Sequence, residues 1–357
     1  PPPTPPREPD RPQLALATLA VPLATGIALA ALYGPHLAVI AVIGPVVALG
    51  GWLAARHAAD RSARAARHAH ESALDQLRAD ATERRAIEEA ARRRAQPDLH
   101  DIVHRGLRRD PRVWERRRHH HDFLHLSVGP GDLAWQPAVT TTPDAAAAAV
   151  LDAIGPLRSV PITVDADALV GIVGPRPLAV ALARSLALQA AVLHGPADVR
   201  MLVATSSAHA VDWSWTRWLP HTVDPHDHCV RSIATDPVAT GDLAASRASC
   251  DDGPVDWWIV DGDDDALART GALRAALTDR DAGARGLVLA DRREHLPSTC
   301  ATAVEVGRDG TVVVQRFEHG SAPMTATLVG CSAVTAEAVA RRLAGLRDPE
   351  LGGASAT

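Results

Sequence analysis

Two long uncharged apolar runs distinguish the N-terminal part of the chain. The first covers residues 14–33 and the second covers residues 37–55. Each run is long enough to cross a hydrocarbon core of about 30 Å as a helix. Only the tripeptide Gly-Pro-His separates them, so two crossing helices would return the chain to the same side of a membrane. We therefore predict a transmembrane helical hairpin over residues 13–55.

The residues that flank these runs predict how such a hairpin would be oriented. Tyr33 and Trp52 lie near opposite membrane faces, where aromatic rings are enriched. Arginines precede and follow the pair of runs, with Arg56 the first to follow, while the connecting loop has none. Because cytoplasmic segments carry the excess of arginine, both termini are expected in the cytoplasm of a multi-pass plasma-membrane protein. Alanine is nearly neutral toward insertion, so a buried hairpin in a soluble protein is the alternative.

A charged stretch follows the second apolar run. Residues 56–96 are rich in alanine, arginine and glutamate and contain neither glycine nor proline. This composition predicts one long helix that continues out of the second run. Arg84 and Glu88 interrupt its apolar stripe, so a strong two-stranded coiled coil is not predicted. We assign residues 56–109 to a cytoplasmic helical stalk, whose arginines either contact anionic lipid or are solvated.

From residue 161 onward the pattern alternates between short buried runs and longer helical stretches. Strands are expected at 162–164, 169–173, 199–204, 257–260, 286–290, 303–306 and 311–315. Helices are expected at 177–193, 264–277 and 333–346. This alternation predicts an α/β domain over residues 161–348, with a mostly parallel sheet covered on both faces. The last two strands flank Gly-Arg-Asp-Gly and are expected to form a hairpin. Residues 349–357 are assigned to a C-terminal linker.

Charge and cysteine content narrow the classes of function. The net charge is −5, and every basic residue other than histidine is arginine. Residues 56–118 carry 17 arginines against 11 acidic residues, whereas the residues from 119 onward carry 18 arginines against 29 acidic residues. A basic segment therefore precedes an acidic body, which argues against direct binding of nucleic acid by the body. The four cysteines are far apart, which predicts reduced thiols.

A glycine-containing loop follows the expected strand at 169–173. A working phosphate loop needs inward-pointing backbone N–H groups, a lysine for the phosphate oxygens and a hydroxyl for Mg²⁺. Counted from Gly171, the lysine and hydroxyl positions hold Pro177 and Leu178. Pro175 and Pro177 also remove two N–H donors. The simplest interpretation is a turn from strand to helix, in which Pro177 takes the first helical position.

Four residues nevertheless keep the outline of a nucleotide site: Gly171, Gly174, Arg176 and Asp261. Arg176 is the one side chain of the loop that could meet a phosphate. Asp261 follows a buried run, where ATPases place the carboxylate that orients Mg²⁺. Gly262 stands where a catalytic glutamate would be expected. We predict a degenerate phosphate loop with no catalytic residue and no ATP hydrolysis.

The connecting segment, residues 110–160, contains a block that resembles a known family. Its motif residues are Trp114, Glu115, Arg116, Arg117, Asp122 and Phe123. This block is similar to the "WERR…DFL…VG.G" block of EccC, the FtsK/SpoIIIE-type ATPase subunit of type VII secretion. A second element, "W.W..WLPH", is matched at Trp213 or Trp215, and at Trp218, Pro220 and His221. The proline-rich residues 1–12 resemble the family's lead-in to its anchor.

The resemblance implies a membrane-proximal, ATPase-like domain between an anchor and ATPase modules. EccC-like proteins continue into FtsK-type modules with intact phosphate loops, which imply ATP and Mg²⁺ for the full-length family. This sequence contains no GxxxxGK[ST] and stops about where the linker to the first module would begin. We therefore expect a membrane-anchored scaffold with no cofactor in this segment. Its expected partners are other membrane components of the secretion complex, ATPase modules in cis or in trans, membrane lipid and further copies of itself.

Two other functions remain open from the residues. The chain could be the front end of an FtsK/SpoIIIE-type DNA translocase, or a genuine nucleotide-binding domain that uses Arg176 in place of lysine. His221, His226, His228 and Cys229 could hold a metal ion, but their spacing matches no structural zinc pattern, so no metal site is predicted. Arg217, next to the tryptophan cluster, is a candidate for contact with a neighbouring domain.

Overall fold

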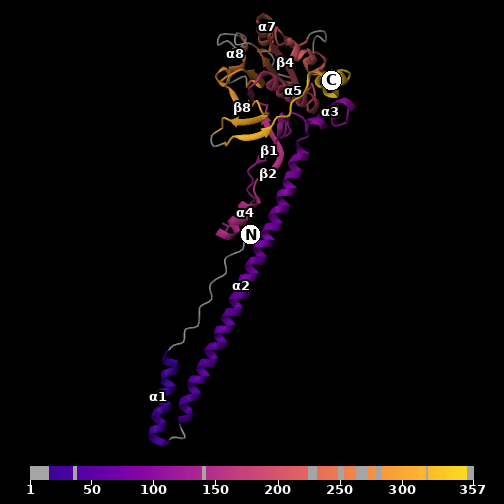
Figure 1. Ribbon diagram of the computed structural model, residues 1–357. Coiled ribbons are helices and arrows are strands. Elements are labelled where there is room, and N and C mark those ends of the chain that lie inside the picture. The colour runs from indigo at the N-terminus through magenta and orange to yellow at the C-terminus, as the bar shows by residue number, and fades with distance from the viewer. Residues whose placement is uncertain are drawn as a thin grey trace. The chain divides into compact units, whose positions relative to one another are not determined.

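The computed structural model describes residues 16–34, 38–138, 142–223, 231–247, 253–262, 272–278, 283–318 and 321–351. The chain divides into two compact units, and Figure 1 labels their elements. The first unit comprises Pro1–Ala86 and Trp135–Gly155, and the second comprises Ile87–Ala134 and Pro156–Thr357.

The first unit is helical. Helix α1 covers Leu16–Tyr33, and α2 covers Ala38–Ala95, whose last turns belong to the second unit. As predicted, the charged stretch continues the helix of the second apolar run without a break, and α2 ends two residues before Pro97. The short α4, Ala145–Ile154, begins at Asp144, whose side chain accepts a hydrogen bond from the backbone N–H of Ala147 at 2.7 Å.

One helix within the described part of the chain is both long and apolar enough to cross a membrane. It is α5, Arg176–Leu193, and 78% of it is buried inside the protein. Such burial is typical of a core helix in a globular domain. The two runs predicted as a membrane hairpin are helical in α1 and in the first turns of α2, while residues 14, 15 and 35–37 lie outside the described residues.

The second unit is built on one mixed sheet of ten strands. The strands are β1 His125–Leu133, β2 Leu157–Asp165, β3 Leu169–Val173, β4 Val199–Thr205, β5 Ile233–Ala234, β6 Val255–Asp261, β7 Arg285–Ala290, β8 Cys300–Val306, β9 Thr311–Arg316 and β10 Met324–Thr327. Their order across the sheet is β2-β1-β10-β9-β8-β3-β7-β6-β4-β5. From β8 to β5 every neighbouring pair is parallel, and from β2 to β8 every pair is antiparallel.

Helices cover both faces of the parallel half. On one face α5 packs with α3, Leu99–Arg108, and α9, Ala333–Leu343, and these helices share a core with Trp213 and Trp257. On the other face α7, Pro237–Arg247, and α8, Ala272–Thr278, pack over a smaller core. All seven residues of β4 are buried, as expected for a strand covered on both sides. The predicted α/β architecture is confirmed for this half.

The antiparallel half departs from the prediction of strands joined by helices. The hairpin of β8 and β9 around Gly-Arg-Asp-Gly is confirmed, but β1 and β10 are not predicted, nor is β5 at the edge of the parallel half. The sequence of β1 contains Gly129, Pro130 and Gly131, which is typical of a loop. Gly129 has φ +149°, and a Cβ there would collide with the carbonyl oxygen of Thr327. The strand therefore uses its glycines for close approach to its neighbour.

One helix prediction is only partly covered by the described residues. The expected helix at 264–277 corresponds to α8, and residues 263–271 lie outside the described residues. The other two predicted helices match α5 and α9 to within one residue at the start, and α9 ends three residues earlier than expected.

Candidate functional site

The glycine loop forms a turn from β3 into α5, as predicted. Strand β3 ends at Val173, Gly174 follows with φ +150°, and α5 begins at Arg176. A Cβ at Gly174 would collide with the carbonyl oxygen of Val306, so this position requires glycine. Pro175 caps the helix without a side-chain hydrogen bond, and Pro177 is its second residue. The helix thus begins one residue earlier than the sequence predicts.

Arg176 points back over the end of the sheet and is held by two carboxylates. Its Nη1 lies 2.8 Å from Oδ1 of Asp261, and its Nη2 lies 3.0 Å from Oδ2 of the same residue. Nη2 also donates to Oδ2 of Asp212 at 2.7 Å. Burial lowers the pKa of the Arg176 guanidinium, but the hydrogen bonds and charges of Asp261 and Asp212 raise this pKa on balance. Arg176 is therefore a charged clamp between β6 and α6, Ala210–Trp213.

The carboxylate of Asp261 is enclosed and fully engaged. Asp261 is only 2% exposed, and its Oδ2 accepts a hydrogen bond from Nε1 of Trp213 at 2.7 Å in addition to those from Arg176. The adjoining cavity, lined by Gly174, Arg176 and Asp261 among others, measures about 50 Å³. In this arrangement Mg²⁺ could reach the carboxylate of Asp261 only if its ion pair with Arg176 were broken.

The tryptophan of the WERR block is hydrogen-bonded to the C-terminal end of α5. Trp114 is 7% exposed and has φ +66°. Its Nε1 donates to the carbonyl oxygen of Ala191 at 3.1 Å, and its backbone N–H donates to that of Val192 at 2.9 Å. The backbone N–H of Arg116 then donates to the carbonyl oxygen of Leu193 at 2.9 Å. The block therefore satisfies the last carbonyl groups of α5, which have no partner within the helix.

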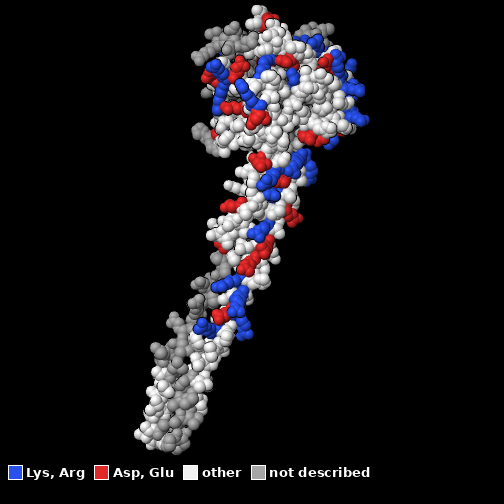
Figure 2. Space-filling view, viewed as in Figure 1, with Lys and Arg blue, Asp and Glu red and all other residues white. Residues whose placement is uncertain are grey.

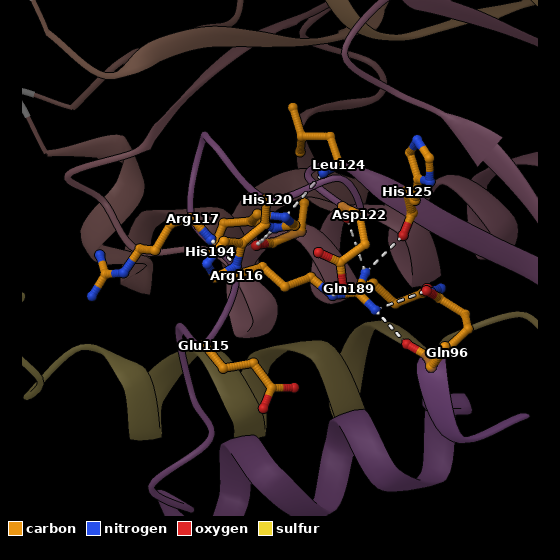
Figure 3. A network of polar contacts seen from close by, with 12 residues as sticks. Gln96, Glu115, Arg116, Arg117, His120, Asp122, Leu124, His125, Gln189 and His194 are labelled. Atoms are coloured by element: carbon orange, nitrogen blue, oxygen red, sulfur yellow. Dashed lines mark hydrogen bonds and ion pairs between the residues drawn. The ribbon is translucent and has the colours of Figure 1, made fainter. Parts of the chain in front are cut away.

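Arg116 is the centre of the polar network in Figure 3. The side chain is 3% exposed, and its Nε pairs with Oδ2 of Asp122 at 2.9 Å. Its Nη1 donates to the carbonyl oxygen of His125 at 2.9 Å, at the start of β1. Its Nη2 donates to the carbonyl oxygen of Ala95 and to Oε1 of Gln96, both at 2.9 Å. A single guanidinium thus joins the end of α2 to the first strand of the sheet.

Gln189 supports the same junction from α5. Its side-chain amide pairs with the backbone of Ser127 in β1, through bonds of 2.9 Å to the N–H and 2.8 Å to the carbonyl oxygen. Its Oε1 also accepts a longer hydrogen bond, at 3.4 Å, from Nε2 of Gln96. Both glutamines are buried. The last turn of α2 is therefore tied to β1 and α5 within the second unit.

Two buried histidines complete this core. Nε2 of His194 accepts a hydrogen bond from the backbone N–H of Leu124 at 3.0 Å, and its Nδ1 lies 3.1 Å from the carbonyl oxygen of Ala190. Nε2 of His221 lies 2.8 Å from the carbonyl oxygen of His194. Burial lowers the pKa of His194 to about 3 and that of His221 to about 4. Both rings are therefore neutral at physiological pH.

The remaining motif residues divide between core and surface. Phe123 and Trp215 are buried, and the ring of Phe123 meets that of His194 edge to face at 5.1 Å between centroids. Arg117 pairs with Asp198 at 3.0 Å and with Asp348 at 3.6 Å. Glu115 pairs with Arg105. Pro220 begins the short η3 helix, Pro220–Thr222, and Trp218 lies under the guanidinium of Arg341 at 4.0 Å.

The motif residues expected to contact other proteins include both buried and exposed side chains. The buried members stabilise the second unit from within, whereas Arg217 is exposed and Trp218 is half-buried. In the first unit, the guanidinium of Arg56 lies 5.3 Å from the centroid of the Trp52 ring. Tyr33 ends α1, and its side chain lies outside what the structure describes.

Sequence reasoning missed several functional neighbours of these residues. Asp212 bonds Arg176, and Gln189 and His194 complete the network around Arg116. Gln189 and His194 are polar residues in or next to a mostly apolar buried helix, which is a usable signal for a buried network. Asp212 carries no such signal, because its partners lie on distant segments of the chain.

No group of three or more potential metal ligands occurs among the described residues. Of the four residues weighed as a metal site, His221 is buried against His194, and His226, His228 and Cys229 lie outside the described residues.

Comparisons with known proteins support the resemblance to EccC over part of the chain. No family model matches the chain. The chain is 30% identical over 131 residues to the ESX secretion system protein EccC of Thermomonospora curvata, which covers 33% of this chain and 10% of that protein. It is 30% identical over 129 residues to the ESX-4 secretion system protein EccC4 of Mycobacterium tuberculosis, covering 32% and 10%. The matches thus span about a tenth of the length of these curated relatives.

Solved structures of EccC and EssC superpose on this chain with low scores. The cytoplasmic domain of the Thermomonospora curvata type VII secretion ATPase EccC superposes with a TM-score of 0.46 at 13% identity, covering 70% of this chain and 35% of that one. A two-ATPase fragment of EssC from Geobacillus thermodenitrificans gives a TM-score of 0.39 at 14% identity, covering 65% and 50%. Scores of this size do not establish a shared fold. The sequence matches support the resemblance to EccC, over about a third of this chain.

Proposed function

We propose that this chain is a membrane-anchored scaffold of a type VII secretion subunit, whose α/β domain couples other membrane components to ATPase modules without using ATP itself. The observation that carries the proposal is the clamp of Arg176 on Asp261 and Asp212, at 2.7 to 3.0 Å. A permanent cation on the domain's own chain neutralises the carboxylate that would otherwise orient Mg²⁺. The domain retains the architecture of a nucleotide site, and its activity is binding to other proteins.

The junction at Arg116 supports a coupling role. This guanidinium bonds the last residues of α2 to β1, and Gln189 bonds the same strand to α5. A load or displacement arriving along the last turns of α2 would reach the sheet through these buried hydrogen bonds. Buried networks of this kind are rigid when every member has a partner.

Exposed apolar side chains support the membrane anchor. Val21, Ile27 and Leu32 of α1 are 63%, 59% and 76% exposed, and Val46 and Val47 of α2 are 62% and 68% exposed. A run of such side chains in contact with water is unfavourable by about 25 cal/mol per Å² of apolar surface. A lipid environment removes that cost. Membrane components of the secretion complex and further copies of the chain are its proposed partners there.

A binding measurement tests the absence of nucleotide chemistry. With the full chain in detergent, saturating ATP and Mg²⁺ should leave the thermal unfolding midpoint unchanged, whereas a ligand at 100 times its dissociation constant would add about 2.7 kcal/mol. The protein should also show no ATP turnover. An ATPase rate that disappears in Asp261→Ala would contradict the proposal, and stabilisation by ATP that disappears in Arg176→Ala would instead favour a nucleotide site built on arginine.

A further inference from the structure

An excess of exposed arginines marks the side of the second unit where α3 and α9 pack together. Figure 2 shows Lys and Arg atoms gathered over the part of the body where Figure 1 labels α3. We define this arginine surface by six exposed residues: Arg108, Arg109, Arg118, Arg217, Arg342 and Arg347. Among the described residues none of the six has an ion pair with an acidic side chain.

Short contacts place these residues next to one another. Nε of Arg109 donates to the carbonyl oxygen of Arg342 at 3.0 Å, which joins the end of α3 to the end of α9. Arg217 precedes Trp218, whose ring lies under Arg341, the neighbour of Arg342. Arg118 and Arg347 each adjoin a member of the Arg117–Asp348 ion pair. These contacts and chain neighbours place the six arginines in one region of the second unit, around the ends of α3 and α9.

Most acidic residues of this region pair with other arginines. Asp110 pairs with Arg112 at 3.1 Å, and Glu337 pairs with Arg341 at 2.7 Å. Arg117 is shared by three carboxylates, those of Asp198, Asp348 and Glu350, so this cluster keeps two negative charges. The six arginines of the surface have no ion pair of their own, and these two charges offset only part of theirs.

The helix dipoles account for only a small part of this charge. The arginine surface contains the C-terminal ends of α3 and α9. Each helix C-terminus carries about half a negative elementary charge, so the two together offset about one positive charge. After the two extra carboxylates of the Arg117 cluster are also subtracted, about three positive charges remain in excess, which is more than the helix dipoles offset.

The composition of the surface favours a protein partner. Leu107 is 39% exposed at the end of α3, and Trp218 with Arg341 over its ring adds an aromatic contact. Arginine and tryptophan are the side chains most enriched at the energetic centres of protein interfaces. Arginine also binds carboxylates in pairs of parallel hydrogen bonds.

The charge of the rest of the body excludes an extended anion. The residues from 119 onward carry 18 arginines against 29 acidic residues. A long duplex or an anionic membrane plane would meet this negative body as well as the arginine surface, whereas a short segment would meet the surface alone. We propose that the arginine surface docks a short acidic polypeptide segment of a partner protein. This inference extends the scaffold role proposed above.

Binding of a defined probe to the full chain tests this proposal. The probe is a labelled peptide of alternating glutamate and leucine, compared with the same peptide carrying glutamine, and the protein is held in nanodiscs of neutral lipid. We expect the glutamate peptide to bind and the glutamine peptide not to bind. Reversing two charges in Arg342→Glu with Arg347→Glu should weaken the affinity about tenfold, and added salt should weaken it further.

A matched control reverses two exposed arginines elsewhere on the body. Arg292 and Arg293 already pair with Glu294 and Glu305, so Arg292→Glu with Arg293→Glu should change the affinity by about twofold at most. Unfolding midpoints check that both variants fold. If the glutamate pair unfolds the protein, Arg342→Gln with Arg347→Gln repeats the test with a smaller loss.

Three results would overturn the proposal. The first is absence of peptide binding or equal losses in both arginine pairs. The second is tighter binding of a short DNA duplex that suffers the same loss in the variant. The third is suppression of peptide binding when the nanodisc contains phosphatidylserine, which would assign the surface to lipid. None of these results alters the ATP measurement, so the inference and the scaffold proposal fail separately.

Discussion

At the scale of single residues, Arg116 joins several segments of the second unit through one buried side chain. Its guanidinium supplies hydrogen bonds to three carbonyl oxygens and to Gln96, and an ion pair to Asp122, while it is only 3% exposed. Lysine would provide one point charge and could not reach groups on both sides of the planar fork. Loss of this side chain leaves buried acceptors and the Asp122 carboxylate without partners.

We therefore predict that Arg116→Ala lowers the free energy of unfolding by about 3–5 kcal/mol, the usual cost of removing one partner of a buried charge. Arg116→Lys should recover only part of that loss. Chemical unfolding of the full chain in detergent measures both values. Arg118→Ala, at an exposed position two residues away, serves as the control and should change stability by about 0.5 kcal/mol or less. A loss shared equally by both variants would contradict this role.

The two buried histidines predict a dependence of stability on pH. Their folded-state pKa values, about 3 for His194 and about 4 for His221, lie below the ordinary value of 6.5. The unfolded chain therefore binds protons first, so the stabilisation is complete above pH 6.5 and is lost as the pH falls toward 4. Near pH 5 the loss is about 2 kcal/mol for each ring.

Unfolding midpoints of the full chain between pH 7 and pH 5 measure this effect. His194→Gln and His221→Gln should lower stability at pH 7 and flatten its decline toward pH 5. His119→Gln, at an exposed ring, should leave the slope unchanged. A slope that persists in both buried variants would assign the pH dependence to carboxylates elsewhere.

At the scale of elements, the contact between β6 and β7 depends on one glycine. Gly286 has φ +124°, and a Cβ there would collide with the backbone of Trp258 on the neighbouring strand. We predict that Gly286→Ala costs about 3 kcal/mol or more, because the strain and the clash add. Gly310 provides a control, since its φ is +81° but a Cβ would meet open space. Gly310→Ala should cost about 1 kcal/mol by strain alone, and equal losses in unfolding experiments would contradict the assigned clash.

The same elements show what the sequence can and cannot predict. The parallel strands β3, β4, β6 and β7 were predicted within one or two residues, because strands buried on both faces are continuous apolar runs. Strand β1 was missed because its glycines and proline resemble a loop, and they are explained only by the neighbouring chain at Thr327. Local patterns predict local structure, whereas close approach between distant segments leaves no local pattern.

The candidate site follows the same rule. Arg176 and Asp261 were identified from a loop and a strand end that each follow a known pattern, and the structure brings them together at 2.8 Å. The second partner of Arg176, Asp212, was not identified, since no spacing along the chain links the two residues. The ion pairs of Arg176 with both Asp261 and Asp212 are therefore seen only in the structure.

At the scale of the whole molecule, the uneven distribution of charged and apolar side chains organises the chain. Residues 14–33 and 37–55 carry no charge, residues 56–118 are basic, and the body that follows is acidic. A basic segment directly after an apolar run is attracted to the anionic cytoplasmic leaflet, by about 1 kcal/mol for each arginine near the surface. An acidic body is repelled from the same leaflet. This order favours one orientation of an anchored chain over the opposite one.

The proposed membrane anchor provides the last prediction. The full chain should sediment with membranes and remain there after alkaline carbonate washing, whereas a chain that begins at residue 56 should not. Val21→Glu with Ile27→Glu places two charges in α1, where each acidic residue costs about 2.5–3.5 kcal/mol near the bilayer centre, and should shift the protein toward the supernatant. Ile87→Glu is the matched control, because Ile87 is an exposed apolar residue of α2, at 57%, within its charged part. Full solubility of the unmodified chain without detergent would refute the anchor. Retention of the α1 double variant in the membrane would assign the anchoring to the first turns of α2, because one apolar helix of about 20 residues is sufficient to span the hydrocarbon core.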